Sequence, residues 1–487
     1  MKYDVIIIGA GMSGTLAGIK LKAQGKSFLI IEKAARMGGT WRDNTYPGLT
    51  CDVQSHAYTY SFEPNPEWTR TFPSGPEIHS YFENVFKKYN LAENTRFNTE
   101  IANAKWQKDH WLLKDQHGQQ YAGSVVIAAT GVLHHPHRPD IPGLADFKGS
   151  LQHTAAWDHS VPLDGKKIAI IGNGSTGVQM VSALSTRAHV RHFQRTPQWI
   201  FPVENMVFTE EQREEFRKNR DLLIYLHDEP TYVAAVERFT NAVLDPDSPE
   251  IMEIQKICQD NLHNSVADPV LRSKLTPSYR AGCKRLIYSP DYYRAIQHPN
   301  SQLITEGIER VEATGIRTSD GQLHELDIIA LATGFKADRF VRPMQVIGLH
   351  DKTLDQAWEN GPTAYKAISM PDFPNFYFMN GPSSPVGNFS LIDTAEMQWG
   401  YIHQLIERLE TANIAGLSAR HQALDIYDQE RKEAARNSVF GSGCTSWYLD
   451  KNGIPNTWPW SQSRFREEMR APVWQDYAEH HLQTVAA

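Results

Sequence analysis

The first strand of the chain and the glycine-rich turn after it constrain the fold more than any other stretch. Residues 5–8 read Val-Ile-Ile-Ile, and four β-branched apolar residues in a row predict a parallel strand buried on both faces. Gly9, Gly11 and Gly14 follow in the G-x-G-x-x-G spacing. The first glycine permits a tight turn, the second lets a pyrophosphate approach the backbone, and the third lets the next helix pack closely. This stretch predicts a dinucleotide-binding βαβ unit, with its helix over about residues 13–24.

The same pattern occurs a second time, but the residue at its far end has the opposite charge. In the first copy, the second strand ends at Glu32, 23 residues after Gly9. In the second copy, a strand ends at Arg195, 23 residues after Gly172. A carboxylate at this position hydrogen-bonds an unphosphorylated ribose, whereas an arginine binds a 2′-phosphate. The first copy is therefore expected to bind FAD and the second NADPH.

The order of the remaining patterns predicts how two domains divide the chain. Residues 208–280 are charged and helix-rich with few strand signals, so a helical insertion is expected there. Two buried strands end in Ala-Thr-Gly, at residues 129–131 and 332–334, which indicates two passages between domains. The expected fold class is α/β, with two Rossmann-like dinucleotide-binding domains (FAD and NADPH) and the helical insertion in the NADPH domain. The expected boundaries are residues 1–145 for the first part of the FAD domain, 146–207 for the first part of the NADPH domain, 208–280 for the insertion, 281–335 for the rest of the NADPH domain, and 336–487 for the rest of the FAD domain with a C-terminal lid anchored by Trp447.

Composition excludes several other classes of protein. A net charge of −7 over 487 residues gives no reason to expect nucleic acid or an anionic membrane as a partner. No apolar run approaches the roughly 18 residues that a membrane span needs. The first strand begins too early in the sequence to leave room for a signal peptide. The oligomeric state stays open.

The cysteines and the clustered histidines indicate neither a metal site nor a redox-active cysteine pair. The residues concerned are Cys51, Cys258, Cys283 and Cys444, which form no C-x-x-C motif, and His134, His135 and His137, which are expected in a boundary loop. The scarcity of cysteine fits a reducing, cytoplasmic setting. FAD and NADPH sites on one chain imply hydride transfer to a flavin, and a disulfide reductase would need a cysteine pair beside that flavin. Reaction with oxygen, or with an unusual acceptor, remains.

Two further motifs connect the chain to a known family. Residues 147–158 read Phe-Lys-Gly-Ser-Leu-Gln-His-Thr-Ala-Ala-Trp-Asp, which resembles the F-x-G-x-x-x-H-x-x-x-W-[PD] fingerprint of type I Baeyer–Villiger monooxygenases. Residues 38–52 match a second signature of that family, [AG]-G-x-W-x4-[FY]-P-[GM]-x3-D, at every fixed position. The fixed positions of the fingerprint are Phe147, Gly149, His153, Trp157 and Asp158.

The resemblance implies roles for individual residues. It places FAD against Gly9, Gly11, Ser13, Gly14, Glu32, Thr40, Trp41, Asp52, Tyr58 and Ile101. It places NADPH against Gly172, Asn173, Gly174, Ser175, Thr176, Gly177, Val178, Gln179, Arg195, Thr196, Lys284 and Arg285. Arg285 is also implied as the active-site arginine and Asp52 as the acid that pairs with it, whereas His153 and Trp157 are linked to domain movement rather than to chemistry.

The resemblance also implies a reaction. NADPH would reduce the flavin, oxygen would add at C4a to give a peroxyflavin, and the deprotonated peroxide would attack a small organic ketone to give an ester or lactone. A guanidinium is always charged, so Arg285 can stabilise both this anion and the oxyanion that follows. Removing one such donor typically costs roughly 3–4 kcal/mol of transition-state stabilisation.

Two alternatives stay open at this point. Related flavin-containing monooxygenases oxidise nitrogen or sulfur, and they usually carry Tyr or Phe where this chain has Trp157. A non-catalytic nucleotide-sensing protein would also keep both binding folds. Asp43 replaces an aromatic residue found in many ketone-oxidising members, and Arg42-Asp43-Asn44 resembles a shorter branch that oxidises aryl ketones, long-chain ketones or sulfides.

Overall fold

Two sheets organise the structure, a computed structural model that describes residues 2–387 and 389–481. The larger sheet has eight strands in the order β17-β4-β5-β6-β1-β2-β3, with β18 also paired to β6. Its strands are β1 (Lys2–Ile8), β2 (Phe28–Ile31), β3 (Thr95–Arg96), β4 (Ile101–Trp106), β5 (Trp111–Asp115), β6 (Gln120–Ala128), β17 (Gln345–Ile347) and β18 (Phe376–Phe378). We call the part of the protein built on this sheet the first unit.

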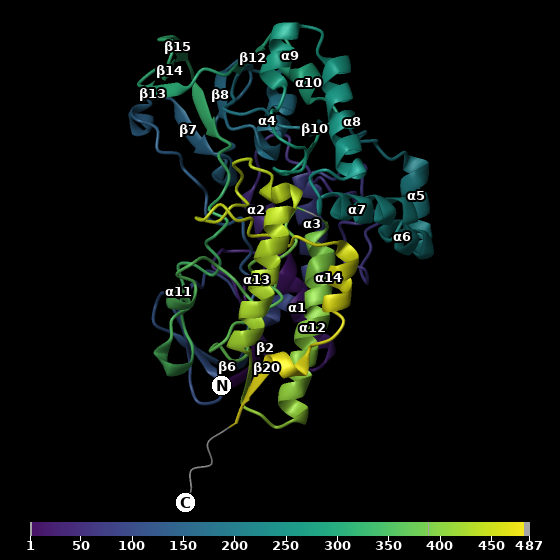
Figure 1. Cartoon of the computed structure of the whole chain (residues 1–487), viewed down its shortest axis with the longest axis vertical. Coiled ribbons are helices and arrows are strands. Elements are labelled where there is room, and N and C mark those ends of the chain that lie inside the picture. The colour runs from purple at the N-terminus through teal and green to yellow at the C-terminus, as the bar shows by residue number, and fades with distance from the viewer. Residues whose placement is uncertain (1, 388, 482–487) are drawn as a thin grey trace, which may run out of the picture.

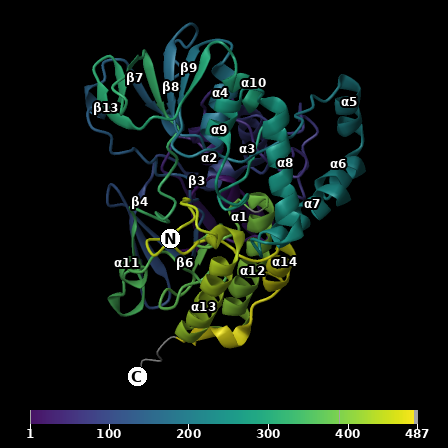
Figure 2. The ribbon, with the colours of Figure 1, turned by 45° about the horizontal axis from the view of Figure 1, so that its top comes forward.

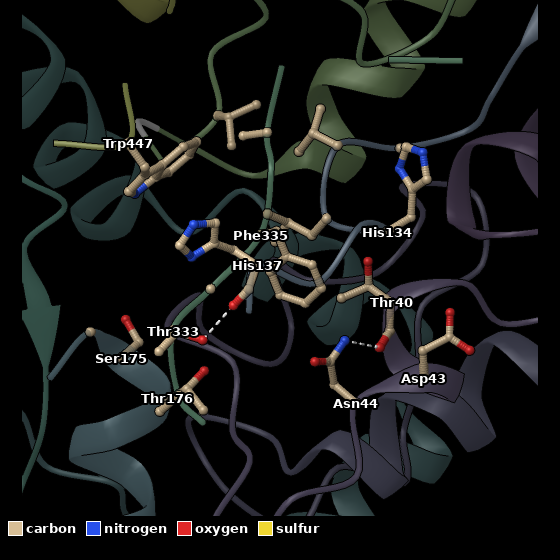
Figure 3. Close-up of a pocket in the computed structure, with 18 of the residues that line it drawn as sticks. Thr40, Asp43, Asn44, His134, His137, Ser175, Thr176, Thr333, Phe335 and Trp447 are labelled. Atoms are coloured by element: carbon tan, nitrogen blue, oxygen red, sulfur yellow. Dashed lines mark hydrogen bonds between the residues drawn. The ribbon is translucent and has the colours of Figure 1, made fainter. Parts of the chain in front are cut away.

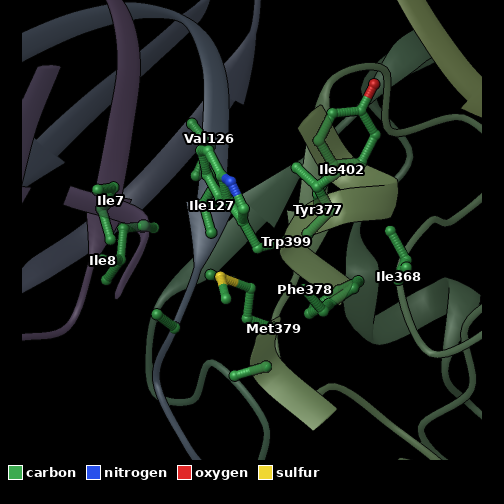
Figure 4. Close-up of a cluster of buried hydrophobic side chains, with 14 of the residues drawn as sticks. Ile7, Ile8, Val126, Ile127, Ile368, Tyr377, Phe378, Met379, Trp399 and Ile402 are labelled. Atoms are coloured by element: carbon green, nitrogen blue, oxygen red, sulfur yellow. The ribbon is translucent and has the colours of Figure 1, made fainter. Parts of the chain in front are cut away.

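The centre of this sheet is parallel and buried, as the apolar run in β1 predicts. Ile8 of β1 lies level with Ile31 of β2 and with Ala128 of β6, so these strands end at the same edge. Figure 4 shows Ile7 and Ile8 of β1 beside Val126 and Ile127 of β6, with Trp399 of α12 (Leu391–Thr411) next to the β6 residues. The remaining helices of the first unit are α1 (Met12–Ala23), α2 (Thr40–Asp43), α3 (Gly75–Lys88), α11 (Leu354–Ala357), α13 (His421–Asn437) and α14 (Gln462–Glu468), and a small sheet pairs β19 (Gly416–Ala419) with β20 (Tyr477–His480).

The second unit is built on a five-stranded sheet that is parallel throughout. Its order is β12-β9-β8-β16-β7. The strands are β7 (Ser150–His153), β8 (Lys167–Ile171), β9 (His189–Phe193), β12 (Ser301–Ile304) and β16 (Ile328–Leu331), with helices α4 (Ser175–Leu184) and α10 (Tyr292–Ile296). Figure 1 shows this unit above the first one, and Figure 2 shows the same arrangement after a 45° turn. The two sheets confirm the α/β fold class.

An antiparallel sheet on the second unit was not expected from the sequence. It joins β13 (Ile308–Glu312), β14 (Gly315–Thr318) and β15 (Leu323–Glu325). These strands are short, and most of their side chains are only partly buried, so they lack the long apolar runs by which the parallel strands can be recognised.

Five helices occupy residues 210–275, where the charged composition predicts helices. They are α5 (Glu210–Lys218), α6 (Arg220–His227), α7 (Pro230–Ala242), α8 (Pro249–Ser265) and α9 (Pro269–Leu275). Three of them start with proline after a capping side chain, a sequence that fits a helix N-terminus because proline lacks an N–H group. On either side of these helices, β10 (Ile200–Phe201) pairs with β11 (Ile287–Tyr288).

Two chain crossings connect the units, and they lie side by side. The His137 N–H donates to the Gly334 carbonyl at 2.8 Å, and the Lys336 N–H donates to the His135 carbonyl at 2.8 Å. The clustered histidines thus lie in a connecting segment. Within the described ranges, no helix is both long and apolar enough to cross a membrane.

Acid should weaken the second unit through His192, a fully buried residue of β9. Burial lowers the pKa of His192 to about 4. In the unfolded chain this histidine binds a proton as the pH falls below about 6.5, whereas in the folded chain it stays neutral down to about pH 4. The free energy of unfolding therefore decreases as the pH falls from about 6.5 to about 4. We expect this loss to reach at most about 3 kcal/mol, and to be smaller in His192→Gln.

Urea unfolding measured between these pH values checks this expectation. His189→Gln is the matched control, because His189 lies on the same strand but is exposed. An identical pH dependence in wild type and His192→Gln would contradict the assignment.

Candidate active site

A cavity of about 1150 Å³ separates the two glycine-rich turns. Figure 3 shows Ser175 and Thr176 of α4 on one side of it, Thr40 and Asn44 of the first unit on another, and Trp447 at a third. The residues expected from sequence that line the cavity are Gly9, Gly11, Ser13, Glu32, Thr40, Trp41, Asp52, Tyr58, Ile101, Gly172, Asn173, Gly174, Ser175, Thr176, Gln179, Arg195, Thr196, Lys284 and Arg285. The fold therefore brings most of the predicted site together at the carboxyl ends of the parallel strands.

The first glycine turn leaves room for a ligand beside α1. A Cβ on Gly14 would lie 1.9 Å from the Gly9 carbonyl oxygen, so this glycine allows the helix to approach the strand. A Cβ on Gly11 would lie 3.6 Å from the Cα of Gly39, and both glycines line the cavity. Gly11 precedes α1 and no side chain caps the helix, so its first N–H groups are open to an anion.

The second turn repeats this arrangement beside α4. A Cβ on Gly177 would lie 2.0 Å from the Gly172 carbonyl oxygen, whereas one on Gly174 would meet no atom within 4 Å. Gly174 precedes α4, which also has no side-chain cap. Both turns thus present a bare helix N-terminus to the same cavity.

The ends of β2 and β9 differ in charge, as the sequence predicts. Glu32 is buried, and its Oε2 accepts from the Ala10 N–H at 2.8 Å. At the corresponding place in the second unit, Arg195 is exposed and lies near Lys284. Burial, together with the charge of Arg195, lowers the pKa of Lys284. Among the residues that the structure describes, neither Arg195 nor Lys284 has an ion-pair partner, so these two neighbouring cations suit a phosphate, whereas Glu32 suits a hydroxyl.

Asp43 belongs to the Glu32 end of the cavity. Arg42 donates from Nε to Asp43 Oδ1 at 2.7 Å and from Nη2 to Asp43 Oδ2 at 2.9 Å. Its Nη1 donates to Glu32 Oε1 at 3.1 Å. Asp43, where the sequence departs from many family members, is therefore connected through Arg42 to the Glu32 carboxylate.

Arg285 and Asp52 meet although 233 residues separate them in sequence. Arg285 Nε donates to Asp52 Oδ2 at 3.1 Å, and Nη2 donates to Oδ1 and Oδ2 at 2.9 and 2.7 Å. The charge of Asp52 raises the pKa of Arg285 further above its ordinary value, although burial opposes this effect. About a third of the arginine side chain, 32%, is exposed, and both residues line the cavity. A charged donor is thus fixed in orientation between the two nucleotide-type turns.

The loop that carries Asp52 is attached to the second unit by hydrogen bonds. The Tyr46 hydroxyl donates to Gln179 Oε1 at 2.8 Å, and Gln179 Nε2 donates to the Thr50 carbonyl at 3.0 Å. Tyr46 occupies the [FY] position of the second signature, but no role was predicted for it from the sequence. Its contact with α4 connects the Asp52 loop to the second glycine turn.

A disulfide lies two residues before Arg285. Cys283 is bonded to Cys444, 161 residues later, and Cys51 and Cys258 are free and buried. Sequence reasoning did not predict this pair, because neither cysteine lies in a local motif.

Several expected site residues lie behind the cavity wall. The Val178 side chain is buried in the core of the second unit, and its N–H donates to the Gly174 carbonyl. Gly14 and Gly177 support the turns from behind. The five fingerprint residues, Phe147, Gly149, His153, Trp157 and Asp158, are likewise absent from the cavity lining among the residues that the structure describes.

The fingerprint instead supports the second unit and its connection to the first. Trp157 packs in the same buried cluster as Tyr46. His153, at the end of β7, lies beside the Phe335 ring of the connecting segment, with ring centroids 6.1 Å apart. Asp158 Oδ1 accepts from the Ser160 N–H at 2.9 Å. The link of His153 and Trp157 to domain movement stays a prediction.

An apolar wall near Arg285 was missed by the sequence reasoning. We use this name for four apolar residues of the cavity lining, of which Val53 follows Asp52 in sequence and Val386 precedes Gly387, next to Arg285; the other two are Phe389 and Leu391. Trp447 also lines the cavity, with 45% of its surface exposed. Trp447 was expected as an anchor of a C-terminal lid. Trp458 and Trp460, in the same tryptophan-rich segment, are buried in the core of the first unit. A stretch with so little periodicity gives no signal of which side chains face a cavity.

Fold and cavity together define an oxidoreductase with two dinucleotide-binding units and a partly buried arginine–carboxylate pair between them. The sequence pattern of the pyridine nucleotide-disulphide oxidoreductase family matches residues 6–215. An uncharacterized monooxygenase of Mycobacterium tuberculosis is 43% identical over 95% of this chain and 93% of its own length.

Two further similarities are more specific. A Baeyer–Villiger monooxygenase of Pseudomonas aeruginosa is 37% identical over 99% of this chain and 91% of its own length. The structure of an oxidized steroid monooxygenase bound to NADP superposes with a TM-score of 0.85 at 26% identity, covering 99% of this chain and 100% of that one. The chain belongs to the family of Baeyer–Villiger monooxygenases, which confirms the resemblance found in the sequence.

Proposed function

We propose that the protein uses FAD and NADPH to insert one oxygen atom of O2 beside the carbonyl of a ketone, giving an ester or lactone. The observation that carries this proposal is the Arg285–Asp52 pair, which lies in one cavity with both glycine turns. FAD fits the first turn, where α1 offers free N–H groups and Glu32 offers a carboxylate. NADPH fits the second, where Arg195 and Lys284 can bind its 2′-phosphate.

The bound cofactors supply the hydride and the activation of O2, and the protein's own residues direct the reaction toward the ketone. Arg285 cannot lose its charge, so it stabilises an anionic oxygen in the cavity and then the oxyanion that develops on the attacked carbonyl. Asp52 orients the guanidinium through two parallel hydrogen bonds. The apolar wall excludes water from this place, which strengthens the electrostatic interaction.

The same wall favours an apolar ketone, such as an aryl or long-chain ketone, as the substrate class. Val53, Val386, Phe389 and Leu391 offer no charged partner for a polar substrate. Sulfides and amines are the competing substrates, because a protonated peroxide oxidises them whereas an anionic one attacks a carbonyl. The fixed positive charge of Arg285 supports the anionic form.

Product analysis by mass spectrometry tests the proposed function. The purified protein is given NADPH and O2 with an aryl ketone in one tube and a thioether in another. An ester from the ketone is the expected result. A sulfoxide without any ester would contradict the proposal and place the protein among the heteroatom-oxidising enzymes. Failure of NADPH to bleach the flavin would point to a nucleotide-sensing protein instead.

Arg195 should decide between NADPH and NADH. Replacing Arg195 with alanine removes a charge-assisted contact to the 2′-phosphate, so we expect KM for NADPH to rise roughly tenfold to hundredfold. KM for NADH should stay the same, because NADH has no phosphate at this position. Initial rates of flavin reduction with both nucleotides measure the effect. An equal change in both KM values would show that Arg195 has no part in recognising the phosphate.

A further inference from the structure

Residues 438–456, the segment after α13, pack against the part of the chain that carries Arg285. We call this segment the C-terminal loop. Cys444 of this loop is bonded to Cys283, and its N–H donates to Cys283 Sγ at 3.3 Å. Phe440, Cys444 and Tyr448 pack in one buried cluster with Cys283 and Leu286, the neighbours of Arg285. The loop is therefore part of the surroundings of the arginine.

Tyr448 brings a hydroxyl group to the guanidinium. The side chain is buried, with 3% of the residue exposed. A Cβ built on Gly387 would lie 2.3 Å from the Tyr448 hydroxyl oxygen and 2.8 Å from Arg285 Nη1, so both atoms lie beside the same point of the Gly387 backbone. Burial raises the pKa of Tyr448, while the charge of Arg285 and a hydrogen bond to it act in the other direction. Arginine has no acceptor, so the phenol oxygen accepts this bond.

Tyr448 and Asp52 lie next to different nitrogen atoms of the Arg285 guanidinium. Asp52 uses Nε and Nη2, whereas the Tyr448 hydroxyl lies next to the place of Nη1. Two contacts on separate nitrogen atoms restrict rotation of the planar group more than either alone.

The backbone of Tyr448 is itself held against the first unit. The Asn456 N–H donates to the Tyr448 carbonyl at 2.7 Å. The Asn456 side chain accepts from the Ser383 hydroxyl at 2.6 Å and donates to the Pro362 carbonyl at 3.0 Å. These hydrogen bonds hold the Tyr448 backbone in place, so its hydroxyl group can orient Arg285.

We propose that Tyr448 is a positioning residue, which accepts a hydrogen bond from Arg285 and, together with Asp52, fixes the guanidinium toward the reacting oxygen atoms. This inference rests on the proposed function. When positioning is intact, ketone, O2, NADPH and H⁺ give ester, NADP⁺ and water. When it is lost, O2, NADPH and H⁺ give NADP⁺ and hydrogen peroxide. The residue should therefore control how many NADPH molecules are consumed per ester.

Tyr448→Phe tests the proposal because it removes only the hydroxyl. We expect FAD content and the anaerobic rate of flavin reduction by NADPH to stay within about twofold of wild type, while the ester formed per NADPH falls roughly tenfold and hydrogen peroxide rises. Tyr427→Phe is the matched control: Tyr427 is also buried, and its hydroxyl has no hydrogen-bond partner among the described residues. That variant should form as much ester per NADPH as the wild type.

A second variant separates the two partners without removing either. In Gly387→Ala, the new methyl group would occupy the place beside the Tyr448 hydroxyl and Arg285 Nη1, and the positive φ of 90° at this residue adds backbone strain. We expect the same loss of coupling with retained flavin reduction, and thermal unfolding of the variant measures the strain separately. The proposal is overturned if neither variant uncouples, or if both lose coupling only together with FAD or flavin reduction. Absence of ester from the wild type would contradict the proposed function instead, so the two failures can be distinguished.

Discussion

Replacing Arg285 with alanine should lower ester formation at least roughly hundredfold and leave flavin reduction by NADPH intact. The reason is that the substitution removes the fixed positive charge at the reacting oxygen atoms and leaves Asp52 without its partner. Within the described part of the chain, neither glycine turn hydrogen-bonds the guanidinium, so binding of the adenosine ends should continue. Anaerobic bleaching of the flavin and ester yield under air measure the two half-reactions separately.

Two further variants sharpen this experiment. Arg285→Lys keeps a charge but cannot form both parallel bonds to Asp52, so it should recover only part of the ester formation. Arg280→Ala is the matched control, because Arg280 lies in the same segment and pairs instead with exposed Asp247 at 3.0 Å. Ester formation by Arg285→Ala at the wild-type rate would remove the arginine from the mechanism.

Replacing two glycines of the second turn with alanine should affect different properties, stability in one case and NADPH binding in the other. Gly177→Ala places a Cβ 2.0 Å from the Gly172 carbonyl oxygen, so backbone must move, and we expect a loss of about 1–3 kcal/mol or more in the free energy of unfolding. Gly174→Ala meets no protein atom within 4 Å. Its methyl group would instead occupy space that a pyrophosphate needs, so KM for NADPH should rise roughly tenfold or more at unchanged stability.

Thermal unfolding and initial-rate kinetics, measured on the same preparations, distinguish these effects. Gly165→Ala is a useful reference for strain, because Gly165 has a positive φ of 70° but no neighbour within 4 Å. If Gly174→Ala bound NADPH as tightly as wild type, the second turn would not be the pyrophosphate site.

The sequence predicted the parts of the site that depend on local pattern. Glu32 and Arg195 could be found because a fixed spacing from a glycine turn places them at the end of a strand. The helices at residues 210–275 could be found because capping residues and charge mark them. Both signals are contained within a few tens of residues.

The remaining parts depend on contacts between distant segments. Arg285 and Asp52 are separated by 233 residues, and only the family resemblance indicated that they pair. Nothing local marks Tyr448 or the Cys283–Cys444 bond, since both depend on how the C-terminal loop folds back. The sheet of β13, β14 and β15 was missed because strand periodicity is weak in such short segments.

The disulfide changes the connectivity of the molecule as well as its local packing. The chain between Cys283 and Cys444 includes the second crossing, near residues 333–337, so the bond closes a covalent ring that passes through both units. A ring of this kind limits how far the units can swing apart, whatever lies between them. The bond therefore joins the C-terminal loop covalently to the segment that carries Arg285, so these two stretches beside the cavity cannot separate while the bond is intact.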